Sequence, residues 1–562
     1  MNDRPSSPRT RPNLKPYQLI AGVLLLLWFG FIWIVQLKAQ ETDMVLRDMK
    51  PVLAWGVAAI VGPLLMIFGI HWWGNALASE KAEFANYRNQ IEARKAEQQA
   101  TQERTYALEI RGVGLGIYTD GQSQIWQFIK KKNDNFASIY PQDAEDYNPS
   151  LTSRENSAKI KVRIAFKNSA GEAVAYWPIP VFALGPPAPY DSASSAAGLI
   201  NSGRNAATLG VTQFLWQDNE STTHAQGMIE RLFTFFDDNP KVPQALIASE
   251  DGDVTRNLYR KPGTPGLKNG HVVPTIYESM TGLLVTRSDR VDRYIRPFVT
   301  HEAEDNQNKN SDLGKLWAFY WDRDREFIDW YEAAEHAKGV KFSLAPGTMS
   351  TAYWQSQLPT LWKTISNRGP GHFEPSPWLP VRWAEHQLKE FDAAPVLGYL
   401  HRPIKVSMQD EHGKRLKPAL QAKALQAGWL KALDTLPAGQ KPVRVFYDTT
   451  NNAEAEIALT NALHSLNTDG QGLDVGNVEE GYDIGRRLGN TGVSGALVEI
   501  NLATIASYLD GGASAVVYAG SDGSLTVQMI SPPDEARKAK NQQNRGADPF
   551  KYGLPSIGRS EG

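Results

Sequence analysis

Three carboxylates that follow a short apolar run come nearest, in residue type and spacing, to a metal site. Residues 245–249 predict a buried strand, and Glu250, Asp251 and Asp253 come directly after it. Strand ends are frequent ligand positions in open α/β sheets, and carboxylate oxygens suit Ca²⁺ or Mg²⁺. The run lacks the regularly spaced ligands of an EF-hand loop, so a solvated turn is the favoured interpretation.

A glycine series, Gly112, Gly114 and Gly116, follows the strand-like residues 106–111. Glycines in this position can bind a phosphate group when a helix begins directly after them. Here the third glycine is wrongly spaced for that motif, and residues 117–119 do not resemble the start of a helix. The pattern therefore predicts a bend or a bulge within a strand.

The known catalytic signatures are absent from the sequence. It contains no P-loop, no nucleophile elbow, no paired-histidine zinc helix and no kinase motif, and residues 301–305 are better interpreted as a surface loop. The chain has no cysteine, which excludes disulfides, thiolate metal sites and cysteine nucleophiles. A serine–histidine–acid triad stays open, because such a triad is recognised by geometry and not by sequence order. We therefore assign no catalytic, cofactor-binding or metal-binding residue, and we expect no cofactor.

Two uncharged apolar runs near the N-terminus, residues 19–35 and 51–73, are long enough to cross a bilayer as helices. The first run is too long for a signal-peptide core, and no small-x-small cleavage site follows it. We predict a basic tail at 1–16 and a transmembrane helical hairpin at 17–75. Residues 76–105 are rich in Ala, Glu, Lys, Arg and Gln and predict a helical stalk, which could also pair weakly with a second copy.

The positive charges around the two runs favour one orientation in the membrane. Basic residues precede the first run and follow the second, so both ends are expected in the cytoplasm. The connecting loop also carries Lys38, Arg47 and Lys50, and a periplasmic location therefore stays the alternative.

The length of 562 residues predicts more than one domain, and we expect a first α/β domain at 106–385. Helices are predicted at residues 123–132, 192–209, 228–236 and 313–338, and strands at 106–111, 159–166, 173–177 and 245–249. Residues 178–189 are rich in proline and should interrupt regular structure. The aromatic residues of 313–338 are expected in the core, with a partner-binding face as the alternative.

A second α/β domain is expected at 386–535, after a loop-rich boundary at 339–380. Helices are predicted at 417–436 and 454–466, and strands at 395–406, 443–447, 496–500, 514–519 and 525–530, the last two joined as a hairpin. Residues 536–562 are expected to be a disordered tail. The net charge of −2 gives no basic field for nucleic acid, so no nucleic-acid partner is expected.

Several segments resemble one known family: residues 106–115, 124–126, 176–180, 246–253 and 514–518 with the hairpin that follows. Together with the two apolar runs, they resemble the type VI lipase adapter family of Gram-negative bacteria. The resemblance implies a non-enzymatic inner-membrane protein that binds a lipase effector and helps to load it onto the spike protein of a type VI secretion system. It carries over no catalytic residue.

The two predicted α/β halves also loosely resemble the thiolase and ketoacyl-synthase fold. Enzymes of that fold use a cysteine nucleophile, which this chain lacks, so the resemblance favours a binding role. Two alternatives stay open: a membrane-associated enzyme of the acyl-transfer or lipid-hydrolase type, and a structural component of an envelope machine.

Overall fold

The chain forms two units, residues 1–104 and residues 105–562. The computed structural model describes residues 14–41, 54–74, 106–132, 135–187, 194–217, 224–260, 263–302, 308–339, 346–450 and 453–552. The predicted stalk, most of the basic tail and most of the loop that joins the two apolar runs lie outside these residues.

The first unit contains the two apolar helices that the sequence predicts. Helix α1 (Lys15–Glu41) and the helix Ala54–Gly74 are both long and apolar enough to cross a membrane. They contact each other, and the ring of Tyr17 lies 5.5 Å edge-on from that of Phe68. A third helix of comparable length and hydropathy, Gly492–Asp510, is mostly buried within the second unit, so its apolar character reflects a position in the core.

The second unit is built on one mixed sheet with the strand order β10-β9-β11-β12-β7-β1-β6-β5-β3-β4. The strands are β1 (Leu108–Ile117), β3 (Pro178–Leu184), β4 (Gln213–Trp216), β5 (Gln244–Asp251), β6 (Ser279–Thr286), β7 (Gly398–Leu400), β9 (Pro442–Tyr447), β10 (Gly481–Asp483), β11 (Ala513–Ala519) and β12 (Leu525–Ser531), with β2 (Asp120–Gly121) and β8 (Ile404–Val406) off this path. Strands β1 and β7 pair antiparallel, with Leu108 opposite Leu400. Strands from both predicted α/β domains therefore share one sheet, and the division at 385/386 stays a prediction.

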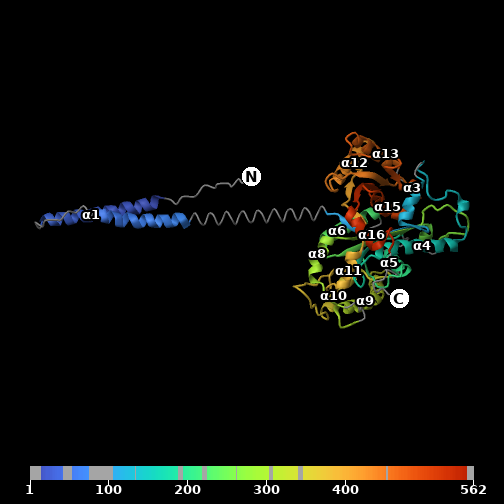
Figure 1. Ribbon diagram of the computed structural model, residues 1–562, viewed down its shortest axis with the longest axis horizontal. Helices are drawn as coiled ribbons and strands as arrows, with labels where there is room; N and C mark the ends of the chain where they lie inside the picture. Colours follow the sequence, from blue (N-terminus) through green and yellow to red (C-terminus); the bar gives the residue numbers. More distant parts are fainter. Residues whose placement is uncertain are drawn as a thin grey trace. The chain divides into compact units, whose positions relative to one another are not determined.

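Several predicted helices are confirmed (Figure 1). They are α3 (Gln122–Lys131), α5 (Ser194–Ala206), α6 (Ala225–Asp238), α9 (Asp312–Ala337), α12 (Pro418–Leu433) and α13 (Ala453–Asn467). The connecting helices are α7 (Asp253–Leu258), α8 (Ser288–Tyr294), α10 (Thr351–Trp362), α11 (Glu385–Ala393) and α14 (Ile484–Leu488). Helix α10 lies in the stretch predicted to be loop-rich. The main core runs through the large sheet, and a smaller apolar cluster lies under α12 and α13.

The glycine series lies in β1, where the backbone of another helix approaches closely. The register of β1 against β6 shifts between Ile110 and Gly112, which confirms the predicted bulge. Gly112, Gly114 and Gly116 face α4 (Leu151–Ala170), and a Cβ atom at Gly114 would lie 1.9 Å from the carbonyl oxygen of Ala165. The glycines thus allow a helix to pack directly on the strand.

Helix α4 corrects the prediction of a strand at 159–166. The alternating apolar residues also fit a helix, because Val162, Ala165, Phe166 and Ser169 are buried on one face while Ile160 is exposed. The helix begins at a Ser150 cap, whose hydroxyl accepts a hydrogen bond from the amide of Ser153. The predicted hairpin partner at 173–177 is consequently wrong.

The proline-rich residues 178–189 also differ from the prediction, since they begin with strand β3. Pro178 and Pro180 pair only with β4, and pairing with β5 begins at Val181. The missing amide protons therefore fall where the strand has a single neighbour.

Two predictions near the C-terminus are wrong. The strand expected at 496–500 is the start of the helix α15 (Gly495–Asp510), because its apolar run continues for several turns and is buried on all sides. The tail expected to be disordered contains α16 (Glu535–Arg545). Arg545 forms an ion pair with Glu172, just after α4, and the buried ring of Phe550 lies edge-on to Tyr508 of α15, so contacts with these two regions fix the segment.

Candidate functional site

The first two acids of the run after residue 249 are buried within the sheet and Asp253 is half-buried at the start of α7, so the predicted solvated turn is wrong. Glu250 and Asp251 belong to β5, and Asp251 has no exposed surface. The fully buried Lys161 of α4 lies beside these acids, with its Nζ 3.5 Å from Glu250 Oε1. The same Nζ lies 2.6 Å from Oε2 of Glu278, the residue that precedes β6. The same ammonium donates to the hydroxyl of Thr255 at 2.7 Å.

The carboxylate of Asp251 joins β5 to a glycine-rich loop at residues 489–495, between α14 and α15. Its Oδ2 accepts from the backbone amide of Val493 at 2.9 Å. The guanidinium of Arg256 donates to both carboxylate oxygens, each at 2.8 Å. Gly492 has a φ of +61°, and a side chain there would collide with Asp251. We call Lys161, Glu250, Asp251 and Glu278, together with the partly exposed Arg256 that pairs with Asp251, the buried ion cluster.

The carboxylates of the buried ion cluster already face cations and hydrogen-bond donors of the protein itself. Two cations face three carboxylates, and burial raises the pKa of Glu250 while the charge of Lys161 opposes that rise. Within the described residues, no group of three or more His, Asp or Glu side chains is arranged to hold a metal ion. The arrangement is that of a structural joint between β5, β6, α4 and the glycine-rich loop.

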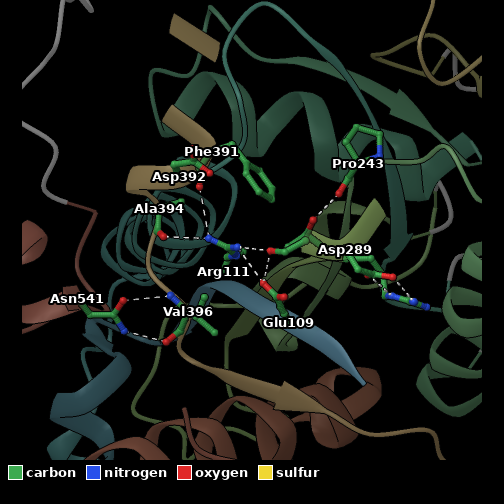
Figure 2. Close-up of polar contacts among 12 residues, drawn as sticks. Glu109, Arg111, Pro243, Asp289, Phe391, Asp392, Ala394, Val396 and Asn541 are labelled. Atoms are coloured by element: carbon green, nitrogen blue, oxygen red, sulfur yellow. Dashed lines mark hydrogen bonds and ion pairs between the residues drawn. The ribbon is translucent and has the colours of Figure 1, made fainter. Parts of the chain in front are cut away.

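A second buried polar group surrounds Arg111 on β1 (Figure 2). Its guanidinium donates to Glu109 at 2.8 Å, to Ser288 at 2.6 Å and to the carbonyl of Ala394 at 3.0 Å. Beside it, Asn541 of α16 donates to the carbonyl of Val396 at 2.8 Å and accepts from the Val396 amide at 3.2 Å. These contacts hold the ends of β1, α8, α11 and α16 together.

One serine lies within hydrogen-bond distance of a histidine. Ser531 Oγ is 2.8 Å from His401 Nε2, and both residues are buried. Where a catalytic triad has a carboxylate, His401 instead bonds to the backbone of Thr435. Burial lowers the pKa of His401 to about 4, which makes it a weak base at neutral pH. The pair therefore has the features of a structural hydrogen bond.

The aromatic helix α9 differs between its two ends. Tyr320 and Phe327 are buried, which confirms the core interpretation for these aromatic residues. In the following turns, Trp330 is 48% exposed and Ile328 is 40% exposed. The core interpretation does not hold for these two positions, and the alternative of a partner-binding face stays a prediction.

The fold and these polar groups define a mixed α/β protein whose buried charges connect its elements, preceded by two apolar helices. Two family models match the chain: "Type VI lipase adapter protein Tla3, N-terminal" at residues 106–269 and "Type VI lipase adapter protein Tla3, C-terminal" at residues 397–532. Together they cover more than half of the sequence, so the chain belongs to the type VI lipase adapter family.

Solved structures that align with this chain include ketosynthases. The ishigamide ketosynthase/chain length factor is 11% identical, with coverage of 76% of this chain and 100% of that chain and a TM-score of 0.36. The ketosynthase from module 6 of the bacillaene synthase of Bacillus subtilis 168 is 9% identical, with coverage of 76% and 70% and a TM-score of 0.37. Similarity at this level transfers neither residues nor activity to this chain.

The sequence identifies the acidic run but gives no sign of its contact with the glycine-rich loop at residues 489–495. Asp251 and Val493 are 242 positions apart, and neither segment carries a signal for the other. Lys161 was missed because it lies on a segment interpreted as a strand, where a charged residue between apolar ones indicates an exposed face.

Proposed function

We propose that this chain is a membrane-anchored, non-enzymatic adapter that binds a lipase effector and assists its loading onto a type VI secretion spike. The observation that carries the proposal is the pair of family-model matches, at residues 106–269 and 397–532. An adapter needs an exposed surface for a partner and no reaction centre. The occupied state of the buried ion cluster and the weak basicity of His401 support this role.

The anchor would be the two apolar helices of the first unit, inserted in the bacterial inner membrane. An even number of spans returns the chain to its starting side, and the basic N-terminal tail favours the cytoplasm. Effector and spike would then meet the second unit before export. A reporter that is active only in the cytoplasm, fused after Gly562, should be active, whereas activity of a periplasmic reporter alone would contradict this location.

The binding step is tested with the full chain in a mild detergent. The tagged chain is co-expressed with an inactivated form of the lipase encoded beside its gene, and the lipase retained after affinity purification is quantified. An unrelated two-helix membrane protein with the same tag is the control. Retention well above this control is expected, and retention at the control level for every lipase encoded nearby would overturn the proposal.

A further inference from the structure

Strand β9 lies where two successive connections of the chain leave to opposite faces of the sheet. It pairs parallel with β10 on one side and with β11 on the other. Helix α13, which leads to β10, shares an apolar cluster with Val445 and Tyr447, whereas α15, which leads to β11, shares the main core with Phe446. Side chains of a strand alternate between faces, so the two helices cover opposite faces of β9. In open α/β sheets, ligands bind at the carboxyl ends of strands at such a point, and Asp448 directly follows β9.

A small space lined by oxygen atoms lies beside Gly495, the first residue of α15. Outside the adjacent residues and the backbone of the helix, a Cβ atom there would have two neighbours within 4 Å: Asp448 Oδ2 at 3.5 Å and Thr491 Oγ1 at 3.7 Å. Thr491 is fully buried, and its hydroxyl has no hydrogen-bond partner within the described residues. The other carboxylate oxygen of Asp448, Oδ1, accepts from the amide of Thr450 at 2.7 Å, which fixes the carboxylate with Oδ2 toward the space.

The carboxyl of Glu499 lies on the same face of α15 as this space. Glu499 comes four residues after Gly495, and helical side chains lean toward the N-terminus of their helix, so Glu499 leans over the turn of Gly495. Glu499 is 1% exposed, and among the described residues its Oε2 has no hydrogen-bond partner. Burial, followed by the charge of Asp448, raises the pKa of Glu499 well above its usual value. The two carboxyls are therefore neighbours, and Glu499 is protonated at neutral pH unless a cation joins it.

The side chains that surround these two carboxyls leave them without a cation. The guanidinium of Arg486 pairs with Asp483 and Glu456, and in the part of the chain that the structure describes neither Asp448 nor Glu499 has an ion pair. Burial raises the pKa of Asp448, and the charge of Asp483 adds to that rise. A buried carboxyl without a donor is costly, and a bound ion is one of the few groups that can supply the missing partner.

We propose that Asp448, Thr491 and Glu499 bind a divalent cation of the Mg²⁺ or Ca²⁺ class in the space beside Gly495. Such hard cations take oxygen ligands, and one or two carboxylates completed by water are sufficient for Mg²⁺. On binding, the cation replaces the proton of Glu499, which is released to the solvent. Because the loop that carries Thr491 also bonds to Asp251, the bound cation fixes the junction between β9, α15 and β5.

The test uses the full chain in detergent, first treated with a chelator and then freed of it. Isothermal titration calorimetry with MgCl₂, and separately with CaCl₂, measures binding, and thermal unfolding with and without each salt measures the stabilisation. The variants are Gly495→Ala, whose methyl group fills the space, and Glu499→Gln, which keeps the shape of a neutral carboxyl but cannot become an anion. Gly210→Ala, at a glycine with no atom near the added methyl, and Asp469→Asn, at an exposed carboxyl, are the matched controls.

The wild type and both controls should bind one cation per chain and unfold several degrees higher with the salt than without it. Gly495→Ala and Glu499→Gln should fold, since the added methyl makes no contact shorter than 3.5 Å and the amide replaces a neutral group, but both should lose the calorimetric signal and the thermal shift. Absence of cation binding by the wild type would overturn the site, and so would wild-type binding in both variants. Neither result bears on the adapter function, which rests on other observations.

Discussion

At the scale of single residues, the protein tolerates buried charge by pairing it. Lys161 has no exposed surface, yet its ammonium is surrounded by Glu278, Glu250, the hydroxyl of Thr255 and the carbonyl of Asp251. Such a cluster contributes less to stability than its charges suggest, because each ion loses its hydration. It is nevertheless costly to disrupt, since removal of one partner leaves the others buried without compensation.

Replacement of Lys161 by Met should lower the free energy of unfolding of the second unit by about 3 to 5 kcal/mol. Lys159→Met, at an exposed position on the same helix, is the control and should have little effect. The double variant with Glu278→Gln should recover part of the loss, because the second change removes the orphaned carboxylate. Chemical denaturation followed by tryptophan fluorescence measures all three, and equal stability of the two lysine variants would contradict a buried ion cluster.

His401 should make stability depend on pH. Burial lowers its pKa to about 4 in the folded state, against about 6.5 for an unfolded chain, so the unfolded state binds more protons between these values. The part of the free energy of unfolding that depends on a neutral His401 is fully present above about pH 6.5. It decreases by up to about 3 kcal/mol as the pH falls toward 4.

The His401→Asn variant should therefore lose less stability than the wild type as the pH is lowered from 7.5 to 4.5. The comparison is made on unfolding midpoints, with His412→Asn, at an exposed histidine, as the control. A wild-type profile parallel to that of His401→Asn would show that this histidine does not titrate in the expected window.

At the scale of elements, segments with a strong local periodicity were predictable from the sequence, and segments with an ambiguous periodicity were not. Helices α6, α12 and α13 carry long amphipathic patterns, and the β11–β12 hairpin has an Asp522–Gly523 turn, so each was predictable. Helices α4 and α15 were not, because apolar residues in alternation or in a short run fit a strand equally well until tertiary contacts decide. The contact between Asp251 and the glycine-rich loop depends on how the sheet is assembled, which local sequence does not encode.

The close packing of α4 on β1 can be tested at Gly114. A Cβ atom there would lie 1.9 Å from the carbonyl oxygen of Ala165 and 2.8 Å from Ser169 Oγ, so Gly114→Ala forces the helix away from the strand. We expect a loss of about 1 to 3 kcal/mol in the free energy of unfolding. Gly210→Ala, where no atom lies within 4 Å of the added methyl, should change stability by less than about 0.5 kcal/mol. Equal effects of the two substitutions would contradict the described packing.

At the scale of the whole molecule, the two segments matched by the family models belong to one sheet. Strand β1 of the first segment pairs with β7 of the second, and Asp251 bonds to Val493 across the same two segments. Helices α9 and α10 belong to the part between them and lie at the opposite side of the second unit from α12 and α13 (Figure 1).

The most direct measurement is the amount of lipase that co-purifies with a tagged spike protein in cells with and without this chain. An adapter that loads the effector predicts that lipase is retained on the spike when the chain is present and falls to background when its gene is deleted. Re-expression of the wild-type chain should restore retention, and expression of an unrelated two-helix membrane protein should not. Equal retention of lipase on the spike with and without the chain would contradict the proposed function.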